Sequence, residues 1–463
     1  MNLPVLGDLH GHGLALARVA PGEPGGDAER RWRDLVDRYV PEQAEDDGAW
    51  RFSRAMRDDE PLQGWKLHVA GTILNAADVL AACAPYLVEH DVLFKCAADL
   101  KHLARLNAGI FYGFGQVGKF ITVYPRNAEA ALSLAAELDS RTRGFEGPRV
   151  PYDLPYRPGG CVYYRYGGFR SLEIVEPDGR RATAIVDPRG KLWTDRREPG
   201  HTYPEWIANP FEVYEAPVVP ELRTAYLVYE ALSQRGKGGV YSAIDIRTIP
   251  ARKCVLKEGR RHGETTADGT DGYDLIGRER AALHSLLSRG VPVPEVLGGF
   301  EAPGHRYLAL EHVDGTNLMA MCSHPRVKLP LDTADTLAAR VARLVADIHA
   351  TGWVWRDLKP LNLIVTDDGR YARLTSRALS GLTRQAASRG ELRAMRLQNS
   401  IAGQSPDRTC PRIFMHSVSR STSCIARSSQ CGSSTTSLPC LKCHRWASPG
   451  KVSISERVRW SRR

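Results

Sequence analysis

The stretch VWRDLKPLNLIVTDDGRYARLTSRAL, from Val354 to Leu379, decides how the second half of the chain is interpreted. Asp357 and Asn362 stand five residues apart with Lys359 and a proline between them, a spacing that polar loops rarely have. Asp357 could orient a hydroxyl group and accept its proton, and Lys359 could neutralise a phosphoryl group. Asn362 offers a hard oxygen ligand to Mg²⁺. The stretch therefore predicts phosphoryl-transfer chemistry.

Upstream residues fit a nucleotide-binding site. The segment RGKGGVY (235–241) lies between two predicted strands, where glycines let the backbone close over phosphates. These glycines are Gly236, Gly238 and Gly239. Lys257 falls on a third predicted strand, and Glu279, on a predicted helix, could orient it through an ion pair. Taken alone, each feature is also explained by a hairpin turn or a solvated charge.

These motifs together resemble the protein kinase fold. The segment LALEHVDG (308–315) is suited to the hinge that binds the nucleotide base, through Glu311 and Val313. The resemblance implies ATP or GTP and Mg²⁺ as cofactors. Two departures are Trp355 in place of the usual histidine and the absence of a third glycine in the glycine loop.

A further departure concerns the metal. The family places a metal-binding Asp, usually followed by Phe, about 13 residues beyond the catalytic-loop Asn, and Thr375 stands there. Loss of one nucleotide would turn a Leu-Asp-Phe-Glu-Gly-Ala reading into Leu-Thr-Ser-Arg-Ala-Leu, which matches residues 374–379. We hypothesise a frameshift at this point, and without the Asp we expect an impaired kinase step.

Charge is concentrated in the same final segment. The 463-residue chain has a net charge of +10, but residues from Thr375 onward carry 16 Lys and Arg against three acidic residues. The preceding residues are close to neutral, so we expect no specific nucleic-acid partner. The last 89 residues contain 18 Ser and one Phe, a composition that predicts disorder. Since no signal peptide or long apolar run is present, we expect a cytoplasmic protein without membrane contact.

The fold class predicted from these patterns is α+β. Alternating strand and helix periods in the first half indicate a mixed α/β domain, and a Pro-rich stretch separates it from the second. The predicted division is 1–27 flexible N-terminus, 28–208 N-terminal domain, 209–222 linker, 223–374 shortened kinase-like domain and 375–463 disordered tail.

Cationic residues recur on predicted strands of the first domain. In GWKLHVAGT the strand period sends Lys66 and His68 to the face opposite Trp65 and its apolar neighbours. Three further segments, VLFKCA, GKFITVYP and VYYRYGGF, supply Lys95, Lys119 at the expected start of a strand, and Arg165. An edge-strand charge explains each residue alone. Gathered in one site, they would bind a phosphate ester and lower one another's pKa, so that a neutral lysine could act as base while an imidazolium protonates the departing phosphate.

The two domains in this order resemble the lyase and kinase portions of class III or class IV lanthionine synthetases. The resemblance implies a kinase that phosphorylates Ser and Thr of a Ser/Thr/Cys-containing precursor peptide and a lyase that eliminates the phosphate. It also implies a cyclase domain, which we expect to be absent after the shifted reading frame. The implied roles are Lys95 as base, His68 as acid, Lys66 as the group polarising the substrate carbonyl, and Lys119 and Arg165 as phosphate ligands. Two alternatives stay open: a Ser/Thr kinase with an accessory N-terminal domain, and a non-catalytic peptide-binding pseudokinase.

Overall fold

The N-terminal domain is built around one sheet. The computed structural model describes residues 26–43, 48–200, 202–214, 218–323, 331–355, 357–366, 372–374 and 382–384. The elements of the first domain are α1 (Gly26–Tyr39), β1 (Glu42–Gln43), β2 (Trp50–Phe52), β3 (Gln63–Val69), α2 (Ala76–Glu89), β4 (Leu93–Ala97), α3 (Leu100–Ala108), η2 (Phe114–Gln116), β5 (Ile121–Tyr124), α4 (Ala128–Arg141), β6 (Leu154–Pro155), β7 (Val162–Gly168), β8 (Glu173–Val175), β9 (Arg181–Val186) and β10 (Leu192–Thr194).

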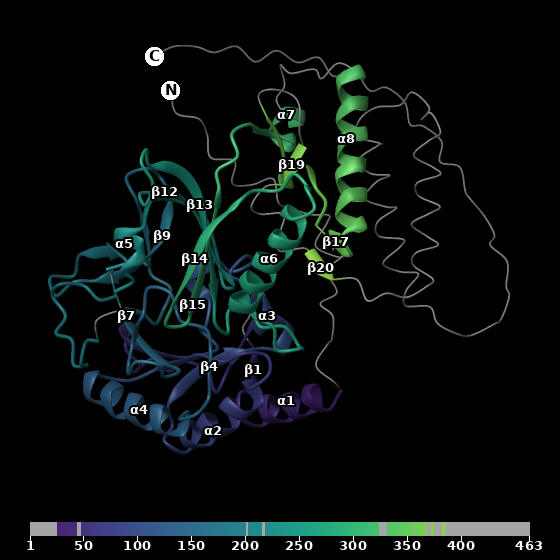
Figure 1. Cartoon of the computed structure of the whole chain (residues 1–463). Helices are drawn as coiled ribbons and strands as arrows, with labels where there is room; N and C mark the ends of the chain where they lie inside the picture. The colour runs from purple at the N-terminus through teal and green to yellow at the C-terminus, as the bar shows by residue number, and fades with distance from the viewer. Residues whose placement is uncertain are drawn as a thin grey trace, which may run out of the picture. The chain divides into compact units, whose positions relative to one another are not determined.

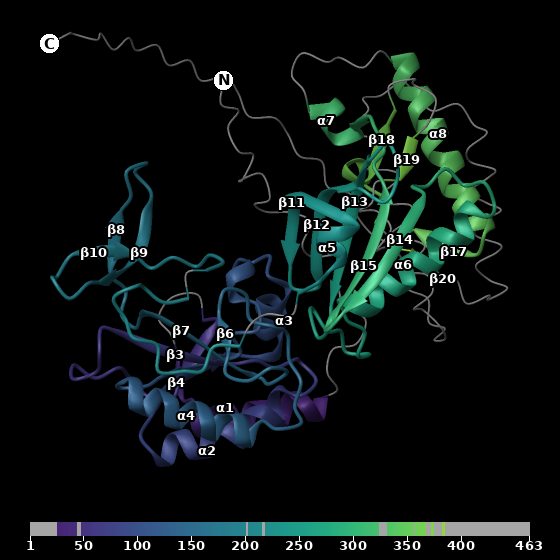
Figure 2. The same ribbon diagram turned by 60° about the vertical axis from the view of Figure 1, so that its left-hand side comes forward.

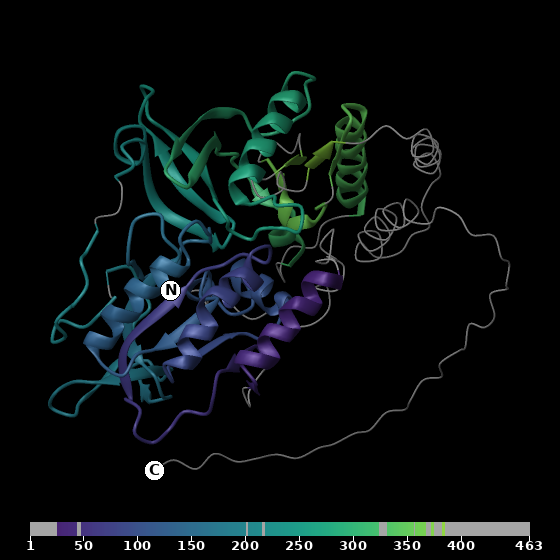
Figure 3. The same ribbon diagram turned by 90° about the horizontal axis from the view of Figure 1, so that it is seen from below.

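The seven-stranded sheet has the order β1-β2-β4-β5-β3-β7-β6, and each neighbouring pair is antiparallel. Helices α1, α2 and α4 lie on one side of it (Figure 1), and the view from below has these helices in front of the strands (Figure 3). Strands β8, β9 and β10 form a separate three-stranded sheet that projects away from the larger one (Figure 2). One face of the main sheet is therefore covered by helices.

Aromatic side chains close the core beside β3. The Trp65 ring packs against Tyr164 at 5.9 Å and Phe211 at 5.4 Å between ring centroids, and Phe211 stacks on Tyr164 at 4.0 Å. Phe211 falls in the predicted linker 209–222, yet it is 5% exposed. The start of that segment thus belongs to the packed core, because its aromatic ring fills space that the sheet leaves open.

The second domain begins with a five-stranded sheet. Its elements are α5 (Glu221–Thr224), β11 (Tyr226–Arg235), β12 (Gly238–Asp245), β13 (Arg252–Arg260), α6 (Gly272–Leu287), β14 (Val296–Ala302), β15 (His305–Glu311), β16 (Thr316–Asn317), α7 (Leu318–Ser323), α8 (Leu331–Ala350), β17 (Trp353–Trp355), η3 (Pro360–Asn362), β18 (Leu363–Val365), β19 (Ala372–Leu374) and β20 (Leu382–Arg384). The sheet order is β11-β12-β13-β15-β14, so β11, β12 and β13 form a meander.

Helix α6 packs against β13 and β15 of this sheet (Figure 1). It starts with a capping box, in which the side chain of Asp271 accepts from the backbone of Asp274 and the Asp274 side chain accepts in return. Such a cap satisfies backbone donors that the first helical turn leaves open. The helix therefore begins at a position that the sequence itself specifies.

Strand β20 lies beyond residue 374, the predicted end of the kinase-like domain. Residues Leu382–Arg384 pair with β17, with Leu382 opposite Trp355. Ordered pairing of the second domain thus reaches at least Arg384. The predicted flexible N-terminus extends to residue 27, but α1 already begins at Gly26. Residues 1–25, Thr375 and the tail beyond Arg384 lie outside the described residues. Within the described part of the chain, no helix is both long and apolar enough to span a bilayer.

Replacing Phe211 by Ala tests whether the supposed linker is part of the core. We expect the variant to lower the free energy of unfolding of the N-terminal domain by about 3 kcal/mol, because a buried aromatic ring is lost and a cavity is left. Urea denaturation followed by tryptophan fluorescence measures the change. The control is Val213→Ala, two residues away and 52% exposed. Equal, small effects of both variants would contradict a packed role for Phe211.

Candidate functional site

The register of the main sheet brings four predicted site residues to one face. Lys66 on β3 pairs directly with Arg165 on β7. His68, two residues further along β3, pairs with Thr122 on β5, and Thr122 pairs on its other side with Lys95 on β4. Paired residues in antiparallel strands point to the same face, as do residues two apart in one strand. The side chains of Lys66, His68, Lys95 and Arg165 therefore share one face of the sheet.

The other face of β3 is apolar, as the strand period predicts. Trp65, Leu67 and Val69 are all buried, and they belong to the main hydrophobic cluster of the domain. Helix α4 packs against β3 on this side. The polar face of the sheet thus holds the candidate site residues, while the apolar face packs in the hydrophobic core.

Lys119 reaches the site from a turn rather than from a strand. The expectation that Lys119 starts a strand is wrong, because its backbone N–H donates to Gln116 O at 3.2 Å and β5 begins only at Ile121. Lys119 is 4% exposed, and its Nζ lies 3.3 Å from Asp153 Oδ1. The lysine therefore joins the same buried charge cluster by another route.

Asp153 also contacts His68. The Nδ1 of His68 lies 2.5 Å from Asp153 Oδ2, and both side chains are buried. Burial alone would raise the pKa of Asp153, but Lys119 and His68 lower it below its usual range. An ionised Asp153 accepts the hydrogen from Nδ1, and this leaves Nε2 of His68 as the atom that can exchange a proton.

A second buried carboxylate holds Arg165. Arg165 Nη2 donates to Asp195 Oδ1 at 2.5 Å and to the carbonyl of Arg196 at 3.0 Å. Arg165 is 2% exposed, and its Nε has no hydrogen-bond partner among the described residues. A buried guanidinium with a donor to spare is suited to an anionic ligand.

Burial, together with neighbouring cations, lowers the pKa of three residues of the site. Burial, and then the charge of Arg165, lowers the pKa of Lys66 to about 7, although Asp195 opposes the shift. Burial lowers the pKa of Lys119 to about 8 against the attraction of Asp153. Burial likewise lowers the pKa of His68 to about 3. At neutral pH the site therefore holds a neutral imidazole and a lysine that is partly in its amine form.

Lys95 sits at the aromatic edge of this face. Its Nζ lies 4.0 Å from the ring centroid of Trp50 and 5.6 Å from that of Phe52. Two strand spacings separate Lys95 from His68, which corresponds to about 10 Å between their backbones. A phosphorylated side chain with its adjoining backbone could bridge that separation.

Sequence reasoning missed both carboxylates, Asp153 and Asp195. Each is buried, and neither belongs to a strand that carries a predicted cation. The signal at Asp153 is its setting between aromatic and proline residues in PYDLPY (151–156), an unusual place for a solvated charge. Asp195, in WTDRRE, gives no comparable signal because adjacent arginines make it look like a surface residue.

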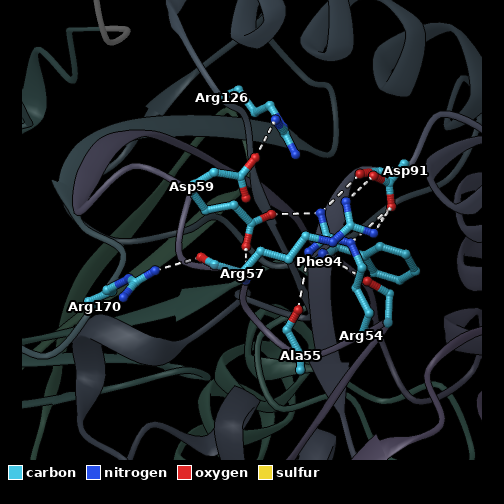
Figure 4. Close-up of polar contacts among 10 residues, drawn as sticks. Arg54, Ala55, Arg57, Asp59, Asp91, Phe94, Arg126 and Arg170 are labelled. Carbon is cyan, nitrogen blue, oxygen red and sulfur yellow. Dashed lines mark hydrogen bonds and ion pairs between the residues drawn. The ribbon is translucent and has the colours of Figure 1, made fainter.

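Ion pairs hold the loop that leads into β3 (Figure 4). Arg57 pairs with Asp91 through two nitrogen atoms, and Arg126 Nη1 lies 3.2 Å from Asp59 Oδ2. Arg170 Nη2 donates to the Arg57 carbonyl at 2.5 Å. These side chains are partly or largely exposed, so solvent screens each pair and its contribution to stability is small. Together they fix the path of the chain just before the strand that carries Lys66 and His68.

The second domain contains the predicted lysine–glutamate pair. Nζ of Lys257, on β13, forms an ion pair with Oε2 of Glu279, on α6. Both side chains are buried, at 5% and 2% exposed. Burial raises the pKa of Glu279, although Lys257 acts to lower it. The pair joins the helix to the sheet and holds the Lys257 ammonium in a fixed place.

The predicted catalytic loop is also compact. Lys359 Nζ lies 2.9 Å from Asp357 Oδ2, and Asn362 Nδ2 donates to the same carboxylate at 3.0 Å and to the Asp357 carbonyl at 2.8 Å. Asn362 is 1% exposed, and its Oδ1 has no hydrogen-bond partner among the described residues. A buried, orphaned amide oxygen fits a hard cation such as Mg²⁺. In the described part of the chain, however, no group of three or more His, Cys, Asp or Glu side chains could hold a metal.

The remaining residues predicted to bind the nucleotide lie in or beside β12 and β15. Gly236 is in the two-residue turn between β11 and β12, and β12 begins with Gly238 and Gly239. Glu311 ends β15, and Val313 lies two residues further on in the segment that joins β15 to β16. The roles of these residues toward a nucleotide remain predictions.

Known proteins match both domains. The family model of the RamC N-terminal domain matches residues 33–220, and that of the protein kinase domain matches residues 226–391. "Probable SapB synthase" of Streptomyces coelicolor is 36% identical over 355 residues, which cover 72% of this chain and 37% of that protein. Serine/threonine-protein kinase F of Synechocystis is 27% identical over 158 residues, 31% of each chain.

These similarities confirm that an N-terminal domain of the RamC type precedes a protein kinase domain in this chain. The α+β fold class is confirmed as well. The chain spans 37% and 31% of the lengths of the two relatives. The kinase match extends beyond the predicted domain end at 374.

The charge cluster predicts a pH-dependent stability. The pKa of Lys66 is about 7 in the folded chain against 10.5 as its ordinary value, so above pH 7 the unfolded state binds more protons. Stability should therefore rise with pH between about 7 and 8.5. Lys66→Met removes the buried cation, so we expect it to increase the free energy of unfolding at pH 7 by about 1–3 kcal/mol and to flatten the rise. Urea denaturation at the two pH values measures both effects.

The control for this prediction is Lys101→Met, an exposed lysine on α3. It should change neither the stability at pH 7 nor its rise with pH. A Lys66→Met variant that is less stable at pH 7 and keeps the full rise would show that Lys66 is not held in a destabilising, desolvated position.

Proposed function

The chain carries a RamC N-terminal domain followed by a protein kinase domain, and from this pairing we propose that it acts as a phosphopeptide lyase with an impaired kinase. The substrate would be a precursor peptide that contains Ser, Thr and Cys. One observation carries the proposal: side chains from β3, β4, β7 and the turn before β5 gather their cationic groups on one sheet face, against two buried carboxylates.

Phosphate binding is assigned to Arg165 and Lys119. The spare Nε donor of Arg165 and the partly desolvated ammonium of Lys119 both suit a phosphate ester. The ester would bring close to two negative charges into the site. This charge favours the protonated forms of His68, Lys66 and Lys119, and so it reverses part of the depression of their pKa.

The elimination then needs one base and one acid. Lys95, as a neutral amine, removes the α-proton of the phosphorylated residue, and the electron pair forms the Cα–Cβ double bond while the Cβ–O bond breaks. His68 gives a proton from Nε2 to the departing phosphate, and Asp153 stabilises the imidazolium through Nδ1. Lys66 polarises the substrate carbonyl. The products are a dehydroamino acid and inorganic phosphate.

The kinase domain is proposed to bind ATP or GTP without efficient transfer. Lys257 would hold the phosphates, Asn362 would offer its orphaned Oδ1 to Mg²⁺, and Asp357 would face the substrate hydroxyl. Mg²⁺, when bound, would neutralise negative charge on the phosphates. Position 375, where the family has a second metal ligand, carries a threonine hydroxyl in this sequence, which is a much weaker ligand.

A pre-phosphorylated peptide tests the lyase directly. We expect mass spectrometry to detect loss of the elements of phosphoric acid from a phosphoserine peptide incubated with the full chain. Lys95→Met and His68→Asn should each slow this loss by at least about 100-fold, because each removes a proton-transfer group. Lys101→Met should leave the rate unchanged.

Other outcomes identify the alternatives. Tight binding of an unchanged phosphopeptide would contradict the lyase and favour a non-catalytic peptide-binding protein. Release of phosphate that regenerates serine would indicate hydrolysis instead of elimination.

The kinase proposal has a separate test. With radiolabelled ATP, Mg²⁺ and an unphosphorylated Ser/Thr peptide, we expect ATP binding but transfer at or near background, because the principal metal carboxylate is absent from the sequence. Lys257→Met should weaken the ATP binding. Robust phosphorylation by the full chain, lost in Asp357→Asn, would contradict impairment and support a functional Ser/Thr kinase.

A further inference from the structure

One arginine forms hydrogen bonds with residues in and just before the glycine turn between β11 and β12. Arg260, the last residue of β13, donates from Nη1 to the carbonyl of Arg235 at 2.9 Å and from Nη2 to Gln234 Oε1 at 2.7 Å. Its backbone N–H donates to the carbonyl of Lys237 at 2.9 Å. The two residues before the turn and the second residue of the turn are therefore all bound by a single side chain and its backbone.

The guanidinium is itself held by a buried carboxylate. Glu258 is 6% exposed, and its Oε2 lies 2.6 Å from Arg260 Nη2. Tyr241 donates its hydroxyl to the same oxygen at 2.7 Å, and His305 Nδ1 lies 2.7 Å from Oε1. These contacts draw on β12, β13 and β15, so the arginine is oriented by three strands of the sheet.

The turn also lies directly on neighbouring backbone. A Cβ placed on Gly238 would come within 1.8 Å of the Glu258 carbonyl, at a φ of +150° that favours glycine. A Cβ on Gly272, the first residue of α6, would come within 1.8 Å of the Lys237 carbonyl. Backbone contacts this close leave the turn little room to move toward β13 or α6. The hydrogen bonds to Arg260 oppose a shift of the turn in the other direction, away from β13 and α6.

Glu258 and Arg260 lie on the face of β13 opposite to Lys257. Successive residues of a strand alternate between faces, and Lys257 is paired with Leu308 while Glu258 is paired with Tyr307. The Lys257–Glu279 pair thus lies on the face of the sheet that α6 covers, and the Arg260 side chain lies on the opposite face. It does not reach the nucleotide side itself.

We propose that Arg260, held by Glu258, is a positioning residue that sets the glycine turn over the nucleotide phosphates. This inference rests on the nucleotide site of the proposed function. The backbone N–H of Gly236 already donates to the Ala108 carbonyl at 3.1 Å. Gly238 and Gly239 are therefore the glycines whose backbone N–H groups would bind phosphate, and they can do so only if the turn keeps its place. A loosened turn costs affinity for the phosphates but not for the base and ribose, which bind elsewhere in the domain.

Calorimetric titration of the full chain with ATP and with adenosine tests the proposal. We expect Arg260→Met to weaken ATP binding about tenfold while adenosine binding is unchanged, since loss of charge-assisted hydrogen bonds has an effect of this order. Gln234→Ala removes one of the partners and should give a smaller change in the same direction. The matched control is Arg261→Met, whose guanidinium lies over the Tyr273 ring, 3.9 Å from its centroid.

The outcomes separate this inference from the proposed function. Wild-type binding of ATP with no change in Arg260→Met or Gln234→Ala would overturn the positioning role alone. Equal weakening of ATP and adenosine would also overturn it, because that pattern indicates general loss of structure. Failure of the wild-type chain to bind either ligand would overturn the nucleotide site and the positioning role together.

Discussion

The N-terminal site depends on compensation of buried cations by two buried carboxylates. Asp153 contacts both His68 and Lys119, and Asp195 pairs with Arg165. Isolated charges are costly to bury, so these pairs allow cationic side chains to stand on a desolvated face. The compensation is incomplete, since Lys66 and His68 still have lowered pKa values. An anionic substrate would supply the missing negative charge.

The second domain uses the same principle for a different purpose. Lys257 and Glu279 form a buried pair between a strand and a helix, and Glu258 holds Arg260 behind the same strand. Adjacent residues of β13 therefore direct two ion pairs to opposite faces of one sheet. One pair joins β13 to α6, and the other orients the arginine that is hydrogen-bonded to the turn between β11 and β12. In the predicted catalytic loop, by contrast, the buried amide oxygen of Asn362 has no hydrogen-bond partner among the residues that the structure describes.

The periodic parts of this account could be predicted from the sequence. Alternation along β3 separated Lys66 and His68 from the apolar face, and the spacing from Lys257 to Glu279 anticipated their ion pair. Contacts made by loops could not be predicted, because a loop residue such as Asp153 has no period that reveals its neighbours. The sequence pattern predicts a strand that starts at Lys119, but the backbone N–H of Lys119 bonds within a turn and β5 begins at Ile121. Long-range partners of this kind are set by tertiary packing.

A bound anion should supply the negative charge that the cationic N-terminal site lacks, and calorimetry with sulfate tests this claim most directly. Sulfate resembles phosphate but carries no titratable proton near neutral pH. Titrations at about pH 7.5 in buffers with different ionisation enthalpies would report protons taken up on binding. The account predicts that sulfate binds to the N-terminal domain with net proton uptake, and that Asp153→Asn or Lys66→Met changes the uptake. Binding without proton exchange, or no binding at all, would contradict it.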